Sequence, residues 1–528
     1  MPSEPVSPPS IVLCTLNAKY IHASLGLRYL LANMGDLRAQ IALREFTIAR
    51  QPQELADEIL TLLGAPQPGR VQIVGLGVYI WNVTQSTALV RLLKAERPAL
   101  KVVLGGPEVS HEVDQQAIVQ LADHVITGWG DISFPKLCRA LLHGPKPLMK
   151  VIAGEQPPLD QIALPYGEYS AADLAHRLLY VEASRGCPFK CEFCLSSLDQ
   201  TAWAFDLDRF LAALDDLYQR GARHFKFVDR TFNLRIDASL RILQFFLDRL
   251  PAADDLFLHF EVVPDHLPDR LKAMLARFPS GVLQLEIGIQ SFDVVVQQRI
   301  SRQQDNAKTE ANLRWLVQSS HAHLHCDLIF GLPGETLASF AAGFDRLYRL
   351  GPHEIQLGIL KRLRGTPIAR HTDAYAMVYD RQPPYTVQQT GVVDAASLQA
   401  FTRFARYWDL IANSGRFSQT LALLLATRSP SAFDAFQAFA DWLWRTTAQT
   451  SALSPEALVD ALFDYLSVEC GLPVDAVRQA LLADYLASGA RASPRALKGW
   501  LPRPDAPEIR ADKTLAQRQQ RHQLVDKF

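Results

Sequence analysis

Three cysteines lie close together in residues 185–194, which read RGCPFKCEFC. Cys187, Cys191 and Cys194 are separated by three and then by two residues. The apolar run before them, residues 178–181, predicts a short buried strand, so the cysteines lie on the loop that leaves its carboxyl end. Thiolates are the usual protein ligands of iron–sulfur clusters. Three thiolates on one loop predict a four-iron cluster in which one iron has no protein ligand.

Other uses of these cysteines stay open beside the cluster. Buried structural cysteines would rarely crowd one polar loop, and a zinc site would need a fourth ligand at matching spacing. His176 lies eleven residues before Cys187, which is a poor match. The remaining cysteines stand singly and predict neither a disulfide framework nor a second cluster: Cys14, Cys138, Cys326 and Cys470.

The composition narrows the class of protein. The 528 residues predict about three domains, and 54 Lys+Arg against 55 Asp+Glu give no sign of a nucleic-acid binder. No apolar run is long enough to span a membrane. Residues 1–10 are rich in proline and serine and lack the basic start and apolar core of a secretory signal. Single cysteines and an oxygen-sensitive cluster favour a reducing, cytoplasmic setting.

Residues 10–144 alternate apolar strands with helices. The strands are expected at 11–16, 71–78, 101–104 and 124–127, and the helices at 24–33, 52–63, 85–95 and 133–142. Near-continuous apolar strands predict a parallel sheet covered on both faces, in a doubly wound, Rossmann-like α/β domain. Such sheets bind ligands beyond the carboxyl ends of their strands, where Gly105, Gly106 and Gly128 would let the backbone approach a ligand. Tight turns would explain these glycines equally well.

A second alternating region follows a proline-rich segment, residues 145–175, which we expect to be an extended linker. Strands are expected at 178–181, 224–228, 256–262, 282–289, 324–330 and 354–360, with helices near 206–220, 237–250, 266–278, 306–319 and 336–350. Six βα units are too few for a closed eight-fold barrel. They predict a partial (β/α)6 barrel, open on one side, with its site at the carboxyl ends of the strands.

Polar residues occupy those strand ends. Glu261, Gln290 and Asp327 would be costly to bury without partners, so they contact each other, cap helices or bind a ligand. For Glu286 the sequence favours neither a structural role nor a ligand-binding role over the other. The loop 361–367, KRLRGTP, either clamps an anionic group or, more simply, is a solvated basic loop.

The region beyond residue 390 is predicted to be helical, with helices at 397–412, 418–427, 431–447, 455–470 and 473–487. The expected organisation is therefore a disordered start at 1–9, an α/β domain at 10–144, a linker at 145–175, a barrel at 176–375, an all-α domain at 376–500 and a mobile tail at 501–528.

The cysteine spacing resembles the signature of the radical S-adenosylmethionine (SAM) superfamily, in which SAM chelates the open iron and is cleaved to a deoxyadenosyl radical. The motifs GIQS at 288–291 and DLIFGLPGET at 327–336 resemble later-strand motifs of the same superfamily, including oxygen-independent coproporphyrinogen oxidases. The resemblance implies that Glu261 meets the SAM ammonium group, that Gln290 and Asp327 meet its ribose hydroxyls, and that Arg302 meets its carboxylate. Asp229 would replace a glutamate found at the second strand of many relatives.

Residues 17–22, 78–82, 105–109 and 128–131 together resemble the cobalamin-binding domain that precedes some radical SAM domains. The resemblance implies corrin contacts from Tyr79, Trp81, Gly105, Gly106, Pro107, Glu108 and Gly128. His22 departs from the motif Asp-x-His-x-x-Gly of domains that ligate cobalt, since the aspartate is missing and the glycine is one residue late, so a hydrogen-bonded loop histidine is the stronger interpretation. Trp129 stands where related fused domains have an acid.

The chain thus resembles cobalamin-dependent radical SAM proteins with a helical C-terminal domain of unassigned role. This implies a 4Fe-4S cluster, SAM and cobalamin as cofactors, and an electron donor such as flavodoxin or ferredoxin. The expected activity is methylation of an unactivated carbon in a small-molecule or peptide substrate. Alternatives are a radical cyclase or rearrangement enzyme of the anaerobic porphyrin cyclase type, and a non-catalytic cobalamin or redox sensor. Methylthio transfer to RNA would call for three further clustered cysteines.

Overall fold

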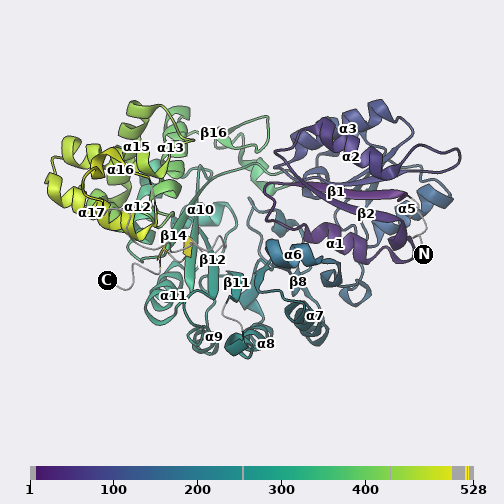
Figure 1. Cartoon of the computed structure of the whole chain (residues 1–528), viewed down its shortest axis with the longest axis horizontal. Helices are drawn as coiled ribbons and strands as arrows, with labels where there is room; N and C mark the ends of the chain where they lie inside the picture. Colours follow the sequence, from purple (N-terminus) through teal and green to yellow (C-terminus); the bar gives the residue numbers. More distant parts are fainter. Residues whose placement is uncertain are drawn as a thin grey trace.

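The computed structural model describes residues 8–252, 255–427, 430–490, 492–501, 518–519 and 521–522. Two parallel six-stranded sheets and a group of C-terminal helices form the chain. Figure 1 shows the first sheet and the C-terminal helices at opposite ends of the long axis, with the second sheet between them. Within the described residues, no helix is long and apolar enough to cross a bilayer.

The first sheet is doubly wound, as predicted. Its order is β2-β1-β3-β4-β5-β6, and its strands are β1 (Ile11–Asn17), β2 (Ile41–Thr47), β3 (Ile73–Gly77), β4 (Lys101–Gly105), β5 (His124–Thr127) and β6 (Val151–Ala153). Helices α2 (Pro52–Leu63), α3 (Val83–Glu96) and α4 (Ala117–Leu121) contribute to one apolar core, and α1 (Leu25–Ala32) and α5 (Ser133–His143) contribute to another. The sheet is therefore buried on both faces.

The sequence analysis did not predict two strands of this sheet, β2 and β6. β2 is an edge strand whose residues are mostly half-buried, so it lacks the continuous apolar signature of β1. β6 has three residues and lies within the proline-rich segment. Residues 145–175 are therefore not a plain linker: they add a strand to the first sheet and then form α6 (Ala171–His176), whose N-cap Ser170 makes a capping box with Asp173.

The second sheet has the predicted open (β/α)6 arrangement. Its order is β14-β13-β12-β11-β10-β7, and its strands are β7 (Leu179–Val181), β10 (His224–Phe227), β11 (Phe257–Val262), β12 (Leu283–Gln290), β13 (His323–Phe330) and β14 (Glu354–Ile359). The helices are α7 (Leu207–Gln219), α8 (Ile236–Leu247), α9 (Asp269–Leu275), α10 (Val294–Arg299), α11 (Asn306–Ser319) and α12 (Leu337–Tyr348). All except the short α10 were predicted. Because the strands follow chain order and the sheet begins and ends at β7 and β14, it stays open.

The C-terminal helices are α13 (Ala395–Ile411), α14 (Ser418–Ala426), α15 (Ala432–Thr447), α16 (Pro455–Asp464), which continues as a π-helical turn (Tyr465–Glu469), and α17 (Val474–Ala487). They extend the apolar core of the barrel, since Phe340 on α12 packs against Phe401 on α13 and Phe433 on α15. Most of the predicted tail at 501–528 lies outside the described residues. Its described part packs on the barrel: Arg518 pairs with Glu354 at the start of β14 and with Asp409 on α13.

Candidate active site

The cysteine loop begins at a short hairpin of β8 (Ser184–Arg185) and β9 (Trp203–Ala204) that follows β7. Cys187, Cys191 and Cys194 line one cavity together with residues from the middle and the carboxyl ends of β11, β12 and β13. Burial raises the pKa of the Cys187 and Cys191 thiols, and the neighbouring thiols raise it further. Such thiols ionise when they bind metal, because coordination compensates the buried negative charge.

A buried glutamate that the sequence did not single out holds this loop. Glu192 lies between the second and third cysteines, and its carboxylate is 2.7 Å from His371 Nε2 and accepts a 2.6 Å hydrogen bond from Ser301 Oγ. Arg370 pairs with the same carboxylate. Two distant chain segments therefore fix the cysteine loop over the barrel. No local pattern could reveal this, because the partners are more than 100 residues away.

The barrel residues assigned to SAM share the cavity of the cysteines. Glu261, Gln290, Arg302 and Asp327 all line it. Arg302 lies 3.7 Å from the Cys191 sulfur and also donates to the carbonyl oxygen of Gly288. Gln290 sits at a β-bulge with a φ of 69°, which turns the strand end at this point. Four residues from β11, β12, β13 and the loop after α10 thus converge beside the sulfurs.

Asp327 fits a ligand site because its own partners are incomplete. Its Oδ1 atom is buried and has no hydrogen-bond partner among the described groups. Burial raises its pKa well above the usual value, and Glu286 and Glu261 raise it further. An unpaired buried acceptor is costly, and a ligand hydroxyl would satisfy it.

Asp229, in contrast, does not line this cavity. It is buried under the loop, where it accepts hydrogen bonds from Ser184 Oγ at 2.5 Å and from the Ala183 amide at 2.9 Å. Burial raises its pKa to about 7. Its neighbour Arg230 lines the cavity instead and donates to Glu261 Oε1 at 2.7 Å.

Glu286 also lines the cavity, inside the barrel. It lies 2.8 Å from His259 Nε2 and accepts from Lys226 Nζ at 3.3 Å. Although burial opposes its charge, these two partners hold its pKa well below the usual value. Glu286 is therefore a paired carboxylate, and this pairing was not readable from the sequence.

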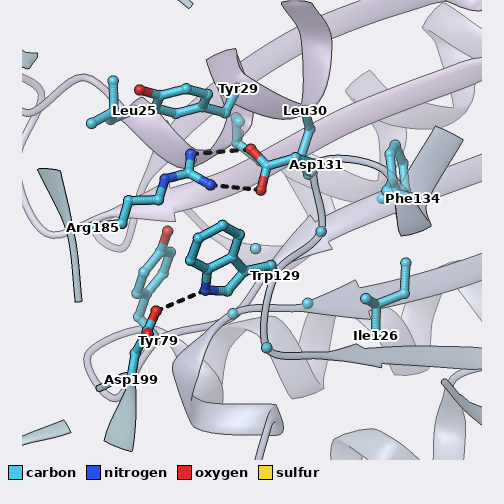
Figure 2. Close-up of a pocket in the computed structure, with 18 of the residues that line it drawn as sticks. Leu25, Tyr29, Leu30, Tyr79, Ile126, Trp129, Asp131, Phe134, Arg185 and Asp199 are labelled. Atoms are coloured by element: carbon cyan, nitrogen blue, oxygen red, sulfur yellow. Dashed lines mark hydrogen bonds and ion pairs between the residues drawn. The ribbon is translucent and has the colours of Figure 1, made fainter. Parts of the chain in front are cut away.

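A second cavity of about 440 Å³ lies between the end of the first sheet and the cysteine loop (Figure 2). Tyr79, Gly105, Gly106 and Gly128 line it, as the resemblance predicts for a corrin site. Gly106 has a φ of 109°, and a Cβ there would lie 2.4 Å from the Val78 carbonyl oxygen. Gly106 therefore lets the end of β4 pack closely against the backbone of Val78 at the edge of this cavity.

The other expected corrin contacts are not among the lining residues of this cavity. Trp81 is 46% exposed and stacks on Tyr79, with ring centroids 4.4 Å apart. Pro107 begins a turn of 3-10 helix, and Glu108 in the same turn is buried. The Glu108 carboxylate is occupied by Arg364 at 2.8 Å and by the Tyr385 hydroxyl at 2.6 Å.

Two polar contacts join the first sheet to the cysteine loop, and Figure 2 shows both. Arg185, two residues before the first cysteine, makes a bidentate ion pair with Asp131 at 2.9 and 3.1 Å. Trp129 donates from Nε1 to Asp199 at 2.8 Å and also lies under the Arg185 guanidinium, 4.8 Å from its ring centroid. Trp129 thus contacts the loop that carries the cysteines.

In the basic loop 361–367, Lys361 is exposed, as expected of a solvated loop, whereas the two arginines are paired with carboxylates of the protein. Arg362 pairs with Glu112 at 3.1 Å, and Arg364 pairs with both Glu108 and Glu112. The loop therefore ties the barrel to the first sheet. His22 lines neither cavity, and its Nδ1 is 2.7 Å from the Tyr180 hydroxyl, which matches the hydrogen-bonded interpretation.

Comparison with protein families gives three consecutive matches. The B12 binding domain matches residues 11–138, the radical SAM superfamily matches residues 181–347, and a protein family of unknown function, DUF4080, matches residues 373–527.

Among curated proteins, the chain is similar to the 2-(S-pantetheinyl)-carbapenam-3-carboxylate methyltransferase of Streptantibioticus cattleyicolor, with 24% identity over 53% of this chain and 45% of that protein. It is also similar to the cobalamin-dependent radical SAM methyltransferase TokK of Streptomyces tokunonensis, with 24% identity over 58% of this chain and 48% of that protein. The chain thus spans about half the length of these relatives.

Solved structures share the fold. The cobalamin-dependent SAM radical enzyme OxsB, with aqua-cobalamin and SAM bound, has a TM-score of 0.59 at 13% identity and is covered over 84%, against 94% of this chain. The methyltransferase TsrM of Kitasatospora setae, with cobalamin and a 4Fe-4S cluster bound, has a TM-score of 0.55 at 15% identity, over 73% of this chain and 82% of that one.

Fold and sites together define a protein in which a Rossmann-like domain faces an open barrel across a loop of three cysteines. The family matches specify these parts: the chain carries a B12-binding domain followed by a radical SAM domain. Its cofactors are accordingly a 4Fe-4S cluster, SAM and cobalamin. The residues fit these groups, since three thiols and an unpartnered Asp327 oxygen share one cavity, and glycines at the strand ends together with apolar and aromatic side chains line the other.

Proposed function

We propose that the chain is a cobalamin-dependent radical SAM enzyme that methylates an unactivated carbon of a small-molecule or peptide substrate. When bound, the cluster supplies the electron that cleaves SAM, and the corrin supplies the methyl group. The observation that carries the proposal is that the cavity beside the cysteines and the cavity of the first sheet adjoin at Arg230, which lines both. Both curated relatives described above are methyltransferases, which supports methyl transfer.

The three cysteines would hold the cluster, with Glu192 orienting their loop from behind. Arg302 would bind the SAM carboxylate, because a guanidinium forms strong charge-assisted hydrogen bonds to a carboxylate and this one already lies beside Cys191. Glu261 would bind the ammonium group. Gln290 and Asp327 would bind the ribose hydroxyls. The buried Asp327 Oδ1 atom, which has no partner among the described residues, supports this role because a ribose hydroxyl would donate a hydrogen bond to it.

The corrin would lie against Tyr79 and the backbone of Gly105, Gly106 and Gly128. Trp81 would reach it only from the rim, behind Tyr79. Glu108, whose carboxylate is already paired, and Pro107 would shape the turn rather than contact the ring. Asp229 would support the loop from below and not touch SAM.

The surroundings of the reaction also remain proposals. An electron donor such as flavodoxin or ferredoxin would reduce the cluster in a reducing, cytoplasmic setting. The balanced charge of the chain supports a small substrate over a nucleic acid. The working division is a B12-binding domain at 10–144, a connecting segment at 145–175, a radical SAM core at 176–375 and a helical domain at 376–500.

Anaerobic purification followed by reconstitution with iron, sulfide, reductant and cobalamin tests the proposal. We expect cluster and corrin spectra together, release of deoxyadenosine from SAM, and S-adenosylhomocysteine as a second product. Deoxyadenosine without S-adenosylhomocysteine would favour the cyclase or rearrangement alternative. A protein that binds both cofactors but never turns over SAM would be a sensor. Zinc without inorganic sulfide in the purified protein would remove the basis for all three.

A further inference from the structure

Arg230 occupies an unusual position between the two cavities. It follows β10, and of the described residues it alone lines both the cavity of the cysteines and the cavity of the first sheet. Its guanidinium donates to Glu261 Oε1 at 2.7 Å. The Arg230 side chain is 51% exposed, whereas the Glu261 side chain is only 17% exposed. Glu261 is therefore part of the buried wall of the cavity of the cysteines, and Arg230 covers it on the side toward solvent.

The partner of Arg230 is the carboxylate that the proposed function assigns to the ammonium group of SAM. A guanidinium and an ammonium group are both cations that donate hydrogen bonds, so they compete for one carboxylate. Holding both against it would also bring two positive charges together, which is unfavourable in a partly buried cavity. Loss of the Arg230 pair costs little, because a half-exposed ion pair contributes little to stability.

We propose that Arg230 is a positioning residue that occupies Glu261 in the SAM-free protein and is displaced from it by the ammonium group of SAM. The inference rests on the proposed function, since it takes Glu261 as the ammonium site. Displacement leaves the guanidinium at the junction of the two cavities, where it lines the corrin side. Arrival of SAM thereby changes the charge facing the substrate before any chemistry begins.

The neighbouring pair in the same cavity offers a matched control. Lys226 also pairs with a carboxylate that lines the cavity, Glu286, at 3.3 Å. Glu286 has a second partner in His259 and no role assigned toward SAM. Removing the Lys226 charge therefore lowers the positive potential of the cavity without freeing the ammonium site.

The test measures SAM affinity of the cluster-loaded protein from the change in the electron paramagnetic resonance spectrum of the reduced cluster. Arg230→Gln is expected to bind SAM about twofold to fivefold more tightly than the wild type, because the competing pair is gone. Arg230→Lys, which keeps the charge, should stay near the wild type. The measurement is made at mildly alkaline pH, because burial raises the pKa of the Glu261 carboxyl. A gain in affinity cannot arise from damage to the fold.

Three variants separate the possible failures. Unchanged or weaker SAM binding in Arg230→Gln, together with weakened binding in Glu261→Gln, would overturn the exchange and leave the SAM assignment intact. Unchanged binding in Glu261→Gln would instead overturn that part of the proposed function. A gain in Lys226→Met as large as that in Arg230→Gln would mean that general electrostatics, not exchange at Glu261, controls the affinity.

Discussion

The two six-stranded parallel sheets bury their strands in different ways. In the first sheet β1 reads IVLCTLN, and all its residues are buried, because helices cover both faces. In the second sheet β12 reads LQLEIGIQ and alternates buried with half-buried residues. Its leucines and isoleucines are the buried ones, and Glu286 and Gln290 lie on the alternate face that lines the cavity. Both faces of the first sheet are buried under helices, whereas one face of the second sheet lines a cavity.

This difference decides how each site is built. A sheet buried on both faces can offer a ligand only its strand ends, so the first site depends on missing side chains such as that of Gly106. A barrel with a polar inner face offers side chains, so the second site depends on the groups present at Glu261, Gln290 and Asp327. Variants that add an atom where backbone lies close, as at Gly106, should damage the first site, and variants that remove a group should damage the second.

The largest effect is expected from Cys191→Ala. Two cysteines cannot retain a four-iron cluster, so the visible absorbance of the cluster and deoxyadenosine release should both be abolished. Because none of the three cysteines lines the cavity of the first sheet, where we propose that the corrin binds, corrin binding should persist. Unchanged visible absorbance in this variant would contradict the cluster assignment.

Gly106→Ala should damage the first sheet. The added Cβ would lie 2.4 Å from the Val78 carbonyl oxygen at a backbone φ of 109°. We expect a loss of about 3 kcal/mol in unfolding free energy, measured by chemical denaturation, together with loss of corrin from the purified protein. Gly105→Ala is the control, because its Cβ would meet only the Ile126 carbonyl oxygen at 3.8 Å. Equal destabilisation by both substitutions would contradict the conclusion that Gly106 is required for close packing against Val78.

Arg302→Ala removes a group from the second site. We expect SAM affinity to fall by about 2 kcal/mol, roughly thirtyfold, because a charge-assisted hydrogen bond to the SAM carboxylate is lost. The cluster absorbance should remain, which distinguishes this variant from Cys191→Ala. Normal SAM affinity would show that Arg302 does not bind the carboxylate.

Asp229→Asn tests a buried carboxyl that supports the site without entering it. The pKa of Asp229 is raised from 3.8 to about 7, so the folded protein holds a proton that the unfolded chain releases. The unfolding free energy should therefore fall as pH rises between these values, by at most about 1.4 kcal/mol per pH unit, and change no further above them. Asp229→Asn should flatten this slope in denaturation of the cofactor-free protein. An identical slope in both proteins would contradict the assignment.

The smallest effect is expected where the two sheets are tied by the basic loop. Arg362→Met removes a partly exposed pair with Glu112, which keeps Arg364 as a partner, so the cost should be about 0.5 kcal/mol. Arg364→Met should cost more, because Glu108 is buried. Denaturation midpoints of the two variants compare them directly. A larger loss of stability from Arg362→Met than from Arg364→Met would contradict the conclusion that the buried pair with Glu108 contributes more than the partly exposed pair with Glu112.

Much of the fold was predictable because hydrophobic periodicity is local. All six strands of the barrel were confirmed, as were the helices of the C-terminal region. β2 and β6 were missed because an edge strand and a strand of three residues bury too little to leave a pattern. The cysteine loop was readable because its residues are adjacent in sequence.

The contacts that complete the sites were not predictable, because their partners are far apart in the chain. Arg230 and Glu261 are separated by 31 residues, Arg185 and Asp131 by 54, and Arg364 and Glu108 by 256. A single sequence gives no signal for such pairs. The assignments of Glu261, Gln290, Arg302 and Asp327 to SAM stay predictions, as do the corrin contacts.

The ion pair between Arg185 and Asp131 bears on how the holoprotein matures. Arg185 is only 11% exposed and is held by Asp131, Glu182 and the rings of Tyr29 and Trp129, immediately before the first cysteine. If residues 128–131 moved on binding a corrin, Arg185 and the cysteine loop that follows it would move with them, and this is the loop that would receive iron and sulfide.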